Sequence, residues 1–371
     1  MNSFRSTPAC LFFLLWLYST SNAQTAVQFT KDRWTFQGTY NQETYLGKPS
    51  VRFTDGSALL NGVQFTNGIL EYDLALAPGR GFVGVSFRMQ NDKNYESFYL
   101  RPHQSGNPDA TQYNPVYNGW PSWQLYHGEG YTAPVQLSFN QWMHVKLVIA
   151  DQQLQVYIDN MAQPVLVVPQ LQRPVQPGTI SVGGASDGAA HYANFSYTVL
   201  EKPLLTPVPP PQAVPAGAIT IWQVSNAFAE SAISNVVQLT PDQKNKLSWQ
   251  TMEAEPTGRL NLARSVVWSS TATTTFARLL IDSEREQTKP LQLGFSDRAQ
   301  VYLNDTLLYR GHDEFRSRDY RFLGSMGYYD TLYVRLRKGR NELWIAIAED
   351  FGGWGVQALL VDQSGLRFPR P

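Results

Sequence analysis

The stretch FVGVSFRMQNDKNYESFYLR, residues 82–101, decides the fold of the first half of this chain. Apolar side chains recur at every second position on both sides of a turn signal at 91–94, which predicts an antiparallel hairpin. The same alternation sorts the side chains onto two opposite faces. We expect one face to carry Val83, Val85, Phe87, Phe98 and Leu100, and the polar face to carry Ser86, Arg88, Ser97, Tyr99 and Arg101.

Similar short runs continue on both sides of this hairpin. Turn dipeptides such as Asn61-Gly62 and Asn67-Gly68 separate them, and regular short strands of this kind predict an antiparallel sandwich. The second half is also rich in strand-like runs, with one helical turn expected at 240–243, where Thr240 and Gln243 have capping-box spacing. The fold class is therefore all-β, with two antiparallel β-sandwich or jelly-roll domains.

A proline-rich segment, EKPLLTPVPPPQAVPAG at 201–217, divides the chain. Proline removes backbone donors and favours extended chain, so this segment is expected to be a semi-rigid linker. We predict a first sandwich domain at 24–200 and a second, jelly-roll domain at 218–371. In the second, AEDFGGWGVQ sets Trp354 among glycines, and we favour a ring that plugs its own sandwich over one that projects onto a ligand.

The first residues resemble a secretory signal peptide, predicted at 1–23. Arg5 precedes an apolar run at 9–18, and cleavage is expected after Ala23. The run is too short to span a bilayer, so we expect a secreted or periplasmic protein without membrane insertion. Removal of the signal would also remove Cys10, the only cysteine, and with it any disulfide or thiolate chemistry.

Charge excludes some partners. The 371 residues include 30 basic and 30 acidic side chains, so no electrostatic footprint for nucleic acid or anionic lipid is present. The five histidines are widely spaced, without a zinc pattern. Calcium ligands can come from scattered loops, with Asp159 and Asp187 as candidates, but no motif supports them. We therefore predict no cofactor.

The polar face of the hairpin suits carbohydrate. Aromatic rings stack on the apolar faces of sugars, while guanidinium and amide groups bond their hydroxyls. The segment PSWQLYHGEG is expected to add a further strand to this face. The alternative is a solvated sheet face whose tyrosines are incidental. The candidate ligand-binding residues are Arg88, Tyr99, Arg101, Trp123, Gln124 and Tyr126.

Glycoside hydrolysis is an alternative function, and it would need two carboxyl groups that face each other. The catalytic candidates are Glu96, Asp109 and Glu129. Glu96 shares its parity with Phe98 and Leu100, which predicts a rim position or partial burial with a raised pKa. Residues 102–120 are expected to be a long loop that walls the cleft.

The segments NGILEYDLAL (67–76), GFVGVSFRMQNDKNYESFYLR (81–101) and FNQWMHVKLVIADQQLQVYIDN (139–160) resemble the concanavalin A-like lectin/glucanase superfamily, in its laminin-G-like and keto-sugar-glycosidase-related branches. This resemblance implies two curved antiparallel sheets with carbohydrate on the concave face. Laminarinase-type members carry catalytic acids as Glu-x-Asp-x-x-Glu. Here Glu71 and Asp73 are followed by Ala75 and Leu76, which argues against that mechanism.

The segments FSDRAQVYLNDTLLYRG (295–311) and LRKGRNELWIAIAED (336–350) look like the galactose-binding-type jelly roll that accompanies β-galactosidases and other glycosidases. We therefore expect a secreted carbohydrate-binding protein that recognises a glycan on the concave face of its first sandwich. Two alternatives stay open: a glycoside hydrolase or related sugar-cleaving enzyme, and a protein-interaction or envelope-scaffold module.

Overall fold

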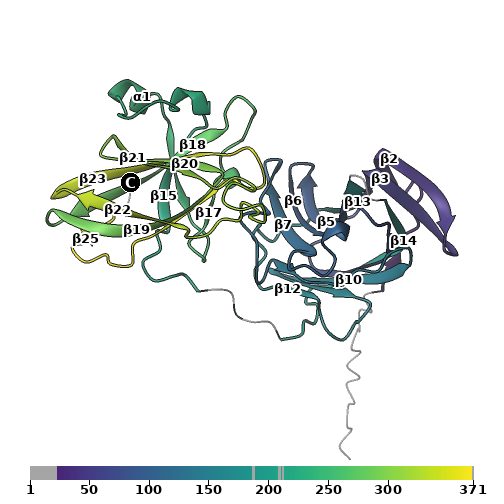
Figure 1. Ribbon diagram of the computed structural model, residues 1–371. Helices are drawn as coiled ribbons and strands as arrows, with labels where there is room; N and C mark the ends of the chain where they lie inside the picture. Colours follow the sequence, from purple (N-terminus) through teal and green to yellow (C-terminus); the bar gives the residue numbers. More distant parts are fainter. Residues whose placement is uncertain (1–22, 186–188, 208–209, 211–212, 370–371) are drawn as a thin grey trace, which may run out of the picture.

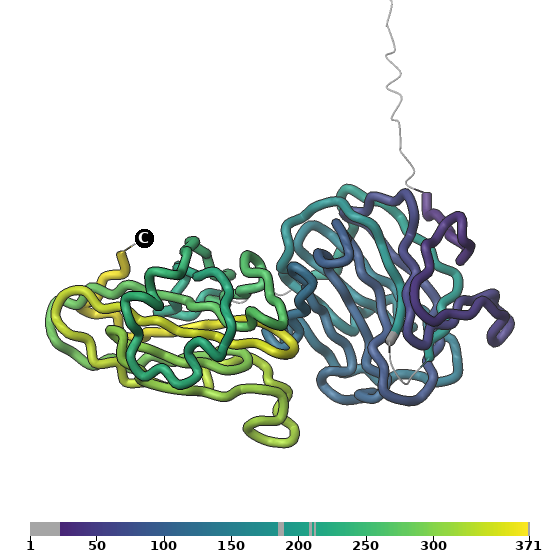
Figure 2. Tube along the Cα trace, turned by 90° about the horizontal axis from the view of Figure 1, so that it is seen from above, coloured from purple at the N-terminus to yellow at the C-terminus, as the bar shows by residue number. Residues whose placement is uncertain are grey.

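The computed structural model describes residues 23–185, 189–207, 210 and 213–369. Two β-rich halves lie side by side, and the β2–β3 hairpin stands at the end of the first half that is remote from the second (Figures 1 and 2). The predicted all-β class, built of antiparallel β-sandwiches, is confirmed. Most of the predicted signal peptide, at 1–22, and Asp187 lie outside the described residues.

The first half contains fourteen strands that backbone hydrogen bonds join into one curled antiparallel sheet. A single-turn 3₁₀ helix, η1 (Pro102–Gln104), follows β6. The strands are β1 (Thr25–Ala26), β2 (Trp34–Tyr45), β3 (Lys48–Leu60), β4 (Gly68–Leu76), β5 (Phe82–Asn91), β6 (Asn94–Leu100), β7 (Thr111–Tyr117), β8 (Trp120–Pro121), β9 (Thr132–Ala133), β10 (Trp142–Ala150), β11 (Gln153–Ile158), β12 (Leu166–Val168), β13 (Thr179–Ala185) and β14 (Ala190–Val199).

The sheet bends over into two layers that enclose a core. Its order is β12-β11-β10-β4-β14-β3-β13-β5-β6-β7-β8. The long strand β3 forms the corner, because Val51 and Phe53 pair with β14 while Ser57 and Leu59 pair with β13. Inward-facing side chains from both layers then form one apolar cluster.

The second half is a two-layer sandwich with its own apolar core. One sheet has the order β16-β15-β18-β23-β20-β21, with β25 beside β18; the other is β17-β24-β19-β22. The elements are β15 (Ile221–Ser225), η2 (Glu230–Ala232), α1 (Pro241–Asn245), β16 (Trp249–Glu253), β17 (Leu260–Asn261), η3 (Leu262–Arg264), β18 (Thr274–Ser283), β19 (Gln287–Ser296), β20 (Arg298–Leu303), β21 (Thr306–His312), β22 (Asp330–Leu336), β23 (Gly339–Ala348), β24 (Gly355–Leu359) and β25 (Leu366–Arg367).

Two local predictions for the second half are confirmed. Thr240 caps α1 in a capping box with Gln243. Trp354 is fully buried in the core and donates its indole N–H to the Ile347 carbonyl. The described residues of 201–217 form neither strand nor helix. Among the helices of the described chain, none has the length and apolar character needed to span a membrane.

The decisive hairpin forms as strands β5 and β6. Its five expected core residues are at most 2% exposed. The prediction of a loop at 102–120 was wrong, because residues 111–116 of β7 pair with β6. All seven residues of β7 are buried, so this strand is an interior part of the sheet rather than a wall of the cleft.

Glycines allow the sheet to bend between β3, β13, β5 and β6. A Cβ atom on Gly84 would lie 1.9 Å from the Phe98 carbonyl oxygen, and one on Gly183 would lie 2.6 Å from the Gly56 carbonyl oxygen. No other residue type permits backbones to approach this closely. The sheet is therefore kinked where these glycines meet.

We expect Gly84→Ala to lower the free energy of unfolding by about 1–3 kcal/mol, because the added methyl group overlaps the backbone of β6. Chemical denaturation measures the change. Gly184→Ala is the matched control, since its nearest neighbour is a flexible Val83 methyl at 3.2 Å. Equal stability losses in the two variants would contradict the explanation.

Candidate functional site

A groove of about 470 Å³ lies on the outer face of the bent part of the first sheet. Two rows of cross-strand neighbours form its floor. One row runs through Gln37, Ser57, Gly183 and Gly84, and it ends at Tyr99 in the wall. The other runs through Ser181, Ser86, Ser97 and Asn114. The volume of the groove falls in the range of small-molecule sites.

Hydroxyl and amide groups dominate the floor of this groove. Ser97 Oγ donates to the Asn114 carbonyl at 2.8 Å, and Ser181 Oγ donates to the Ala58 carbonyl at 3.0 Å. A serine oxygen that donates internally can still accept a hydrogen bond from a ligand. Among the described residues that line the groove, exposed Asp55 is the single carboxylate. The site is therefore polar and nearly uncharged.

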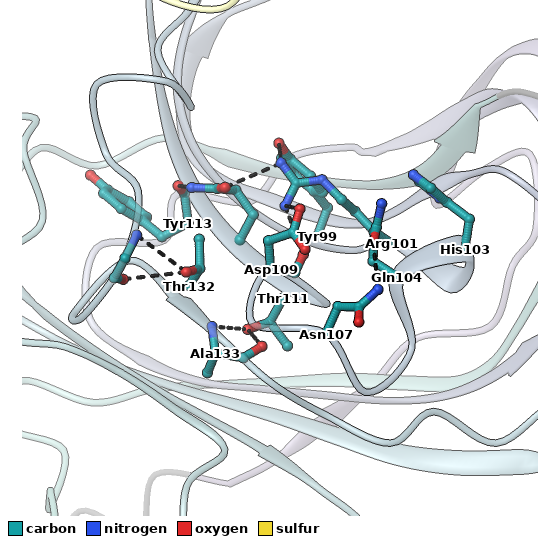
Figure 3. A network of polar contacts seen from close by, with 12 residues as sticks. Tyr99, Arg101, His103, Gln104, Asn107, Asp109, Thr111, Tyr113, Thr132 and Ala133 are labelled. Carbon is teal, nitrogen blue, oxygen red and sulfur yellow. Dashed lines mark hydrogen bonds and ion pairs between the residues drawn. The ribbon is translucent and has the colours of Figure 1, made fainter. Parts of the chain in front are cut away.

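Tyr99 stands in the wall of the groove with Tyr95 and Phe82. Its position agrees with the predicted parity of the hairpin. Burial raises the pKa of the Tyr99 hydroxyl to about 12, so it stays neutral at physiological pH. The Tyr99 oxygen accepts a hydrogen bond from Arg101 at 3.2 Å (Figure 3).

Arg101 supports Tyr99 from behind instead of presenting a free guanidinium to a ligand. It is 4% exposed and also donates to the Asp109 carbonyl at 2.8 Å (Figure 3). A further hydrogen bond runs from Arg101 to Gln112 Oε1 at 3.2 Å. Its guanidinium carbon lies 5.1 Å from the Tyr99 ring centroid and 5.5 Å from that of Trp123. The prediction of a ligand-binding Arg101 is corrected to a positioning role.

Arg88 is on the other side of the sheet from its predicted place. The β5–β6 register shifts after Phe87, and Arg88 adopts a positive φ of 49°. This bulge reverses the alternation. Arg88 is consequently 1% exposed, and it donates to the Thr66 carbonyl at 2.7 Å and the Asp151 carbonyl at 2.6 Å. It stabilises the core layer and cannot reach the groove.

Gln124 and Tyr126 are also corrected, because they join the two halves of the protein. The expected strand at 123–127 is replaced by a turn after β8. The Gln124 N–H donates to the Gly352 carbonyl, and the Gln124 carbonyl accepts from the Met326 N–H. The side-chain amide of Gln124 donates to the Leu323 carbonyl at 2.8 Å. The Tyr126 hydroxyl donates to Glu255. Both residues are fully buried, so neither can bind a ligand.

Further contacts make this junction extensive. The Trp120 and Trp268 rings stack with centroids 4.1 Å apart. Asn261 Nδ2 donates to Ser122 Oγ at 3.0 Å, and the Arg259 guanidinium lies 5.1 Å from the Tyr126 ring centroid. Buried hydrogen bonds and stacked rings of this kind hold the two halves in a fixed relation.

The three catalytic candidates have different surroundings. Glu96 is fully buried in the first core, where its carboxylate accepts from Tyr113 at 2.6 Å and from the Arg173 N–H at 3.0 Å. Burial raises the pKa of Glu96, as its parity predicted. Asp109 lies 3.7 Å from the Arg101 guanidinium, and Glu129 is exposed in a turn. The proposal of a catalytic Glu96 is corrected, because the core encloses it.

Glu71 and Asp73 lie on β4, which contributes no residue to the described lining of the groove. Asp73 accepts hydrogen bonds from Lys48 and Asn194, each at 2.6 Å, and lies 2.9 Å from His144. Asp73 therefore links side chains of β3, β14 and β10. Within the described chain, no three His, Cys, Asp or Glu side chains are arranged to hold a metal ion.

A pair of buried carboxyl groups supports the junction from the second half. Asp297 accepts from the Asp350 and Phe351 N–H groups at 2.9 and 3.1 Å, while Glu349 accepts from Trp120 Nε1 at 3.3 Å. One oxygen of each carboxyl is buried without a hydrogen-bond partner. Burial raises the pKa of Asp297 to about 6, and burial beside Asp297 also raises the pKa of Glu349 well above its ordinary value.

The geometry defines the protein as an antiparallel β-sandwich with an almost uncharged surface groove. Three solved structures are similar in fold: carbohydrate binding module CBM66 from Bacillus subtilis, a Bacillus subtilis protein of unknown function with a galectin-like fold, and the Bacillus licheniformis beta-glucanase. Their identities are 19%, 10% and 15%, and their TM-scores are 0.35, 0.36 and 0.34. The matches cover 44%, 45% and 47% of this chain and 94%, 89% and 94% of those chains.

No protein-family model matches the sequence, and no curated protein matches it. At these TM-scores the structural likenesses do not assign an activity. The groove and its chemistry are therefore the basis on which a function can be assigned.

The sequence placed Ser86 and Ser97 on the polar face, but the small residues of the groove floor were not predicted as site residues. The signal was present, because Gly84 and Ser86 alternate with buried apolar residues just as Ser181 and Gly183 alternate with Ile180 and Val182. The prediction instead chose large polar and aromatic side chains, which are the more obvious candidates for a binding site. Small residues on the outer face of neighbouring strands are the pattern that predicts a hollow.

We expect Asp297→Asn to change how stability depends on pH. In the folded protein Asp297 binds its proton up to a pH of about 6, against an ordinary value of 3.8, so the wild type loses stability as pH rises through this window. The amide does not titrate, so it removes this loss of unfolding free energy, which amounts to up to ~1.4 kcal/mol per pH unit. Denaturation curves across the window measure it, and parallel profiles for both proteins would refute it.

Proposed function

We propose that the protein is an exported carbohydrate-binding protein that holds an uncharged glycan in the groove on β3, β13, β5 and β6. The observation that carries this proposal is the combination of serine hydroxyls and side-chain amides on the floor with the Tyr99 ring in the wall. Hydroxyl and amide groups exchange hydrogen bonds with sugar hydroxyls, and a ring packs on the C–H face of a sugar.

The alternatives fit the groove less well. Glycoside hydrolysis needs two carboxyl groups, and the described groove lining contains only Asp55. A flat, well-filled face would suit a protein-interaction module, whereas this face is hollowed and carries rings. An anionic ligand would find no lysine or arginine among the described lining residues.

The test is affinity electrophoresis of the folded chain in gels that contain β-1,3-glucan, β-1,3-1,4-glucan, xylan, galactan or levan. We expect at least one neutral polysaccharide to retard the wild type. Tyr99→Ala removes the stacking surface, and Ser86→Phe fills the floor while Tyr99 itself is unchanged. Each variant is expected to weaken binding about tenfold or more.

Tyr333→Ala serves as the control, because Tyr333 is 71% exposed on β22 of the second half. It should be retarded like the wild type. Circular dichroism verifies that each variant is folded. If Ser86→Phe is retarded as strongly as the wild type, the ligand does not bind in the groove. If none of the five polysaccharides retards the wild type, the proposed function is rejected.

A further inference from the structure

A row of aromatic rings continues from the wall of the groove onto the second half. The Arg101 guanidinium contacts two rings of this row. Its carbon lies 5.1 Å from the Tyr99 centroid and 5.5 Å from the Trp123 centroid. The Phe351 ring lies 5.7 Å from Trp123, and the Phe315 ring lies 6.2 Å from Phe351. Phe351 is 53% exposed and Phe315 is 38% exposed. The row therefore crosses the junction and ends at the surface.

Single exposed rings are common on protein surfaces, whereas a contiguous row of them marks a surface that binds something. Here the backbone fixes the rings in place. Gln124, the neighbour of Trp123, is held by Gly352, Leu323 and Met326 of the second half. The Phe351 N–H donates to the buried Asp297 carboxyl at 3.1 Å. The rings at both sides of the junction are consequently pre-organised by the same contacts.

We propose that the groove is one end of a longer site, and that Phe351 and Phe315 form a distal subsite for further sugar units of the same glycan chain. This inference rests on the proposed function and adds to it the class of ligand, an extended uncharged polysaccharide rather than a terminal sugar. The occupant follows from continuity, because the rings begin at the groove wall and the centroids of Trp123, Phe351 and Phe315 succeed one another at 5.7 and 6.2 Å.

The chemistry of the distal end agrees with this occupant. The Arg316 guanidinium lies 4.9 Å from the Phe315 ring centroid, so a ring and a planar donor stand together there. This pairing satisfies both the C–H face and the hydroxyls of a sugar. Buried hydrogen bonds and stacked rings join the two halves. Binding across rings that are already held in place costs less conformational entropy than binding across loose ones.

The experiment measures affinity as a function of ligand length. Fragments of the polysaccharide that retards the wild type are separated into disaccharides, trisaccharides and hexasaccharides, and each is titrated calorimetrically into wild type, Phe351→Ala and Phe315→Ala. We expect both variants to bind the short fragments like the wild type. Each should bind the hexasaccharide about five- to tenfold more weakly, because one stacked ring is lost.

Tyr320→Ala is the matched control. Tyr320 is 76% exposed between Phe315 and Phe322 in the chain, and its ring packs with Arg321 rather than with the row. The distal subsite would be overturned if Phe351→Ala and Phe315→Ala bound the hexasaccharide as tightly as the wild type and Tyr320→Ala do. The groove proposal would still stand. Equal weakening for short and long fragments would also overturn the distal subsite, because the rings would then act through the groove. A wild type that binds no polysaccharide would overturn both proposals.

Discussion

The close approach of β5 and β6 at Gly84 is the constraint on which the site depends. A side chain there would overlap the Phe98 carbonyl. A Cβ atom on Gly183 or Gly56 would likewise overlap the backbone of the neighbouring strand. The sheet can bend only because these positions lack a Cβ atom. Bending hollows the outer face, and the serines between the glycines become the floor of the groove.

Contacts with the second half of the chain position the Trp123 ring beside this groove. Gln124 is enclosed by residues of the second sandwich, and Trp120 stacks on Trp268. Trp123 lies between these two anchors, so its ring is positioned by contacts that the first half alone does not supply. The buried carboxyls of Asp297 and Glu349 hold the loop of Phe351 and the Trp120 indole in the same region. The junction is therefore part of the surface that we assign to the ligand.

Sequence reasoning was reliable where one local rule dominated. The alternation in 82–101 identified the core face of the hairpin and placed Tyr99 on the opposite face. It failed at Arg88, where a bulge with positive φ reversed the parity within one residue. It failed again at Gln124 and Tyr126, since a polar or aromatic side chain has the same local pattern whether it meets a ligand or another part of its own chain.

The sequence by itself determined the all-β class, the capped helical turn at Thr240 and the two faces of the hairpin, because each depends on neighbours within a few residues along the chain. Only the tertiary structure decided that Arg101 stands behind Tyr99, that Glu96 is enclosed in the core, and that the turn at Gln124 joins two sandwiches. These contacts depend on how the sheets bend and pack, and most of them pair residues that are distant in sequence, which periodicity does not encode.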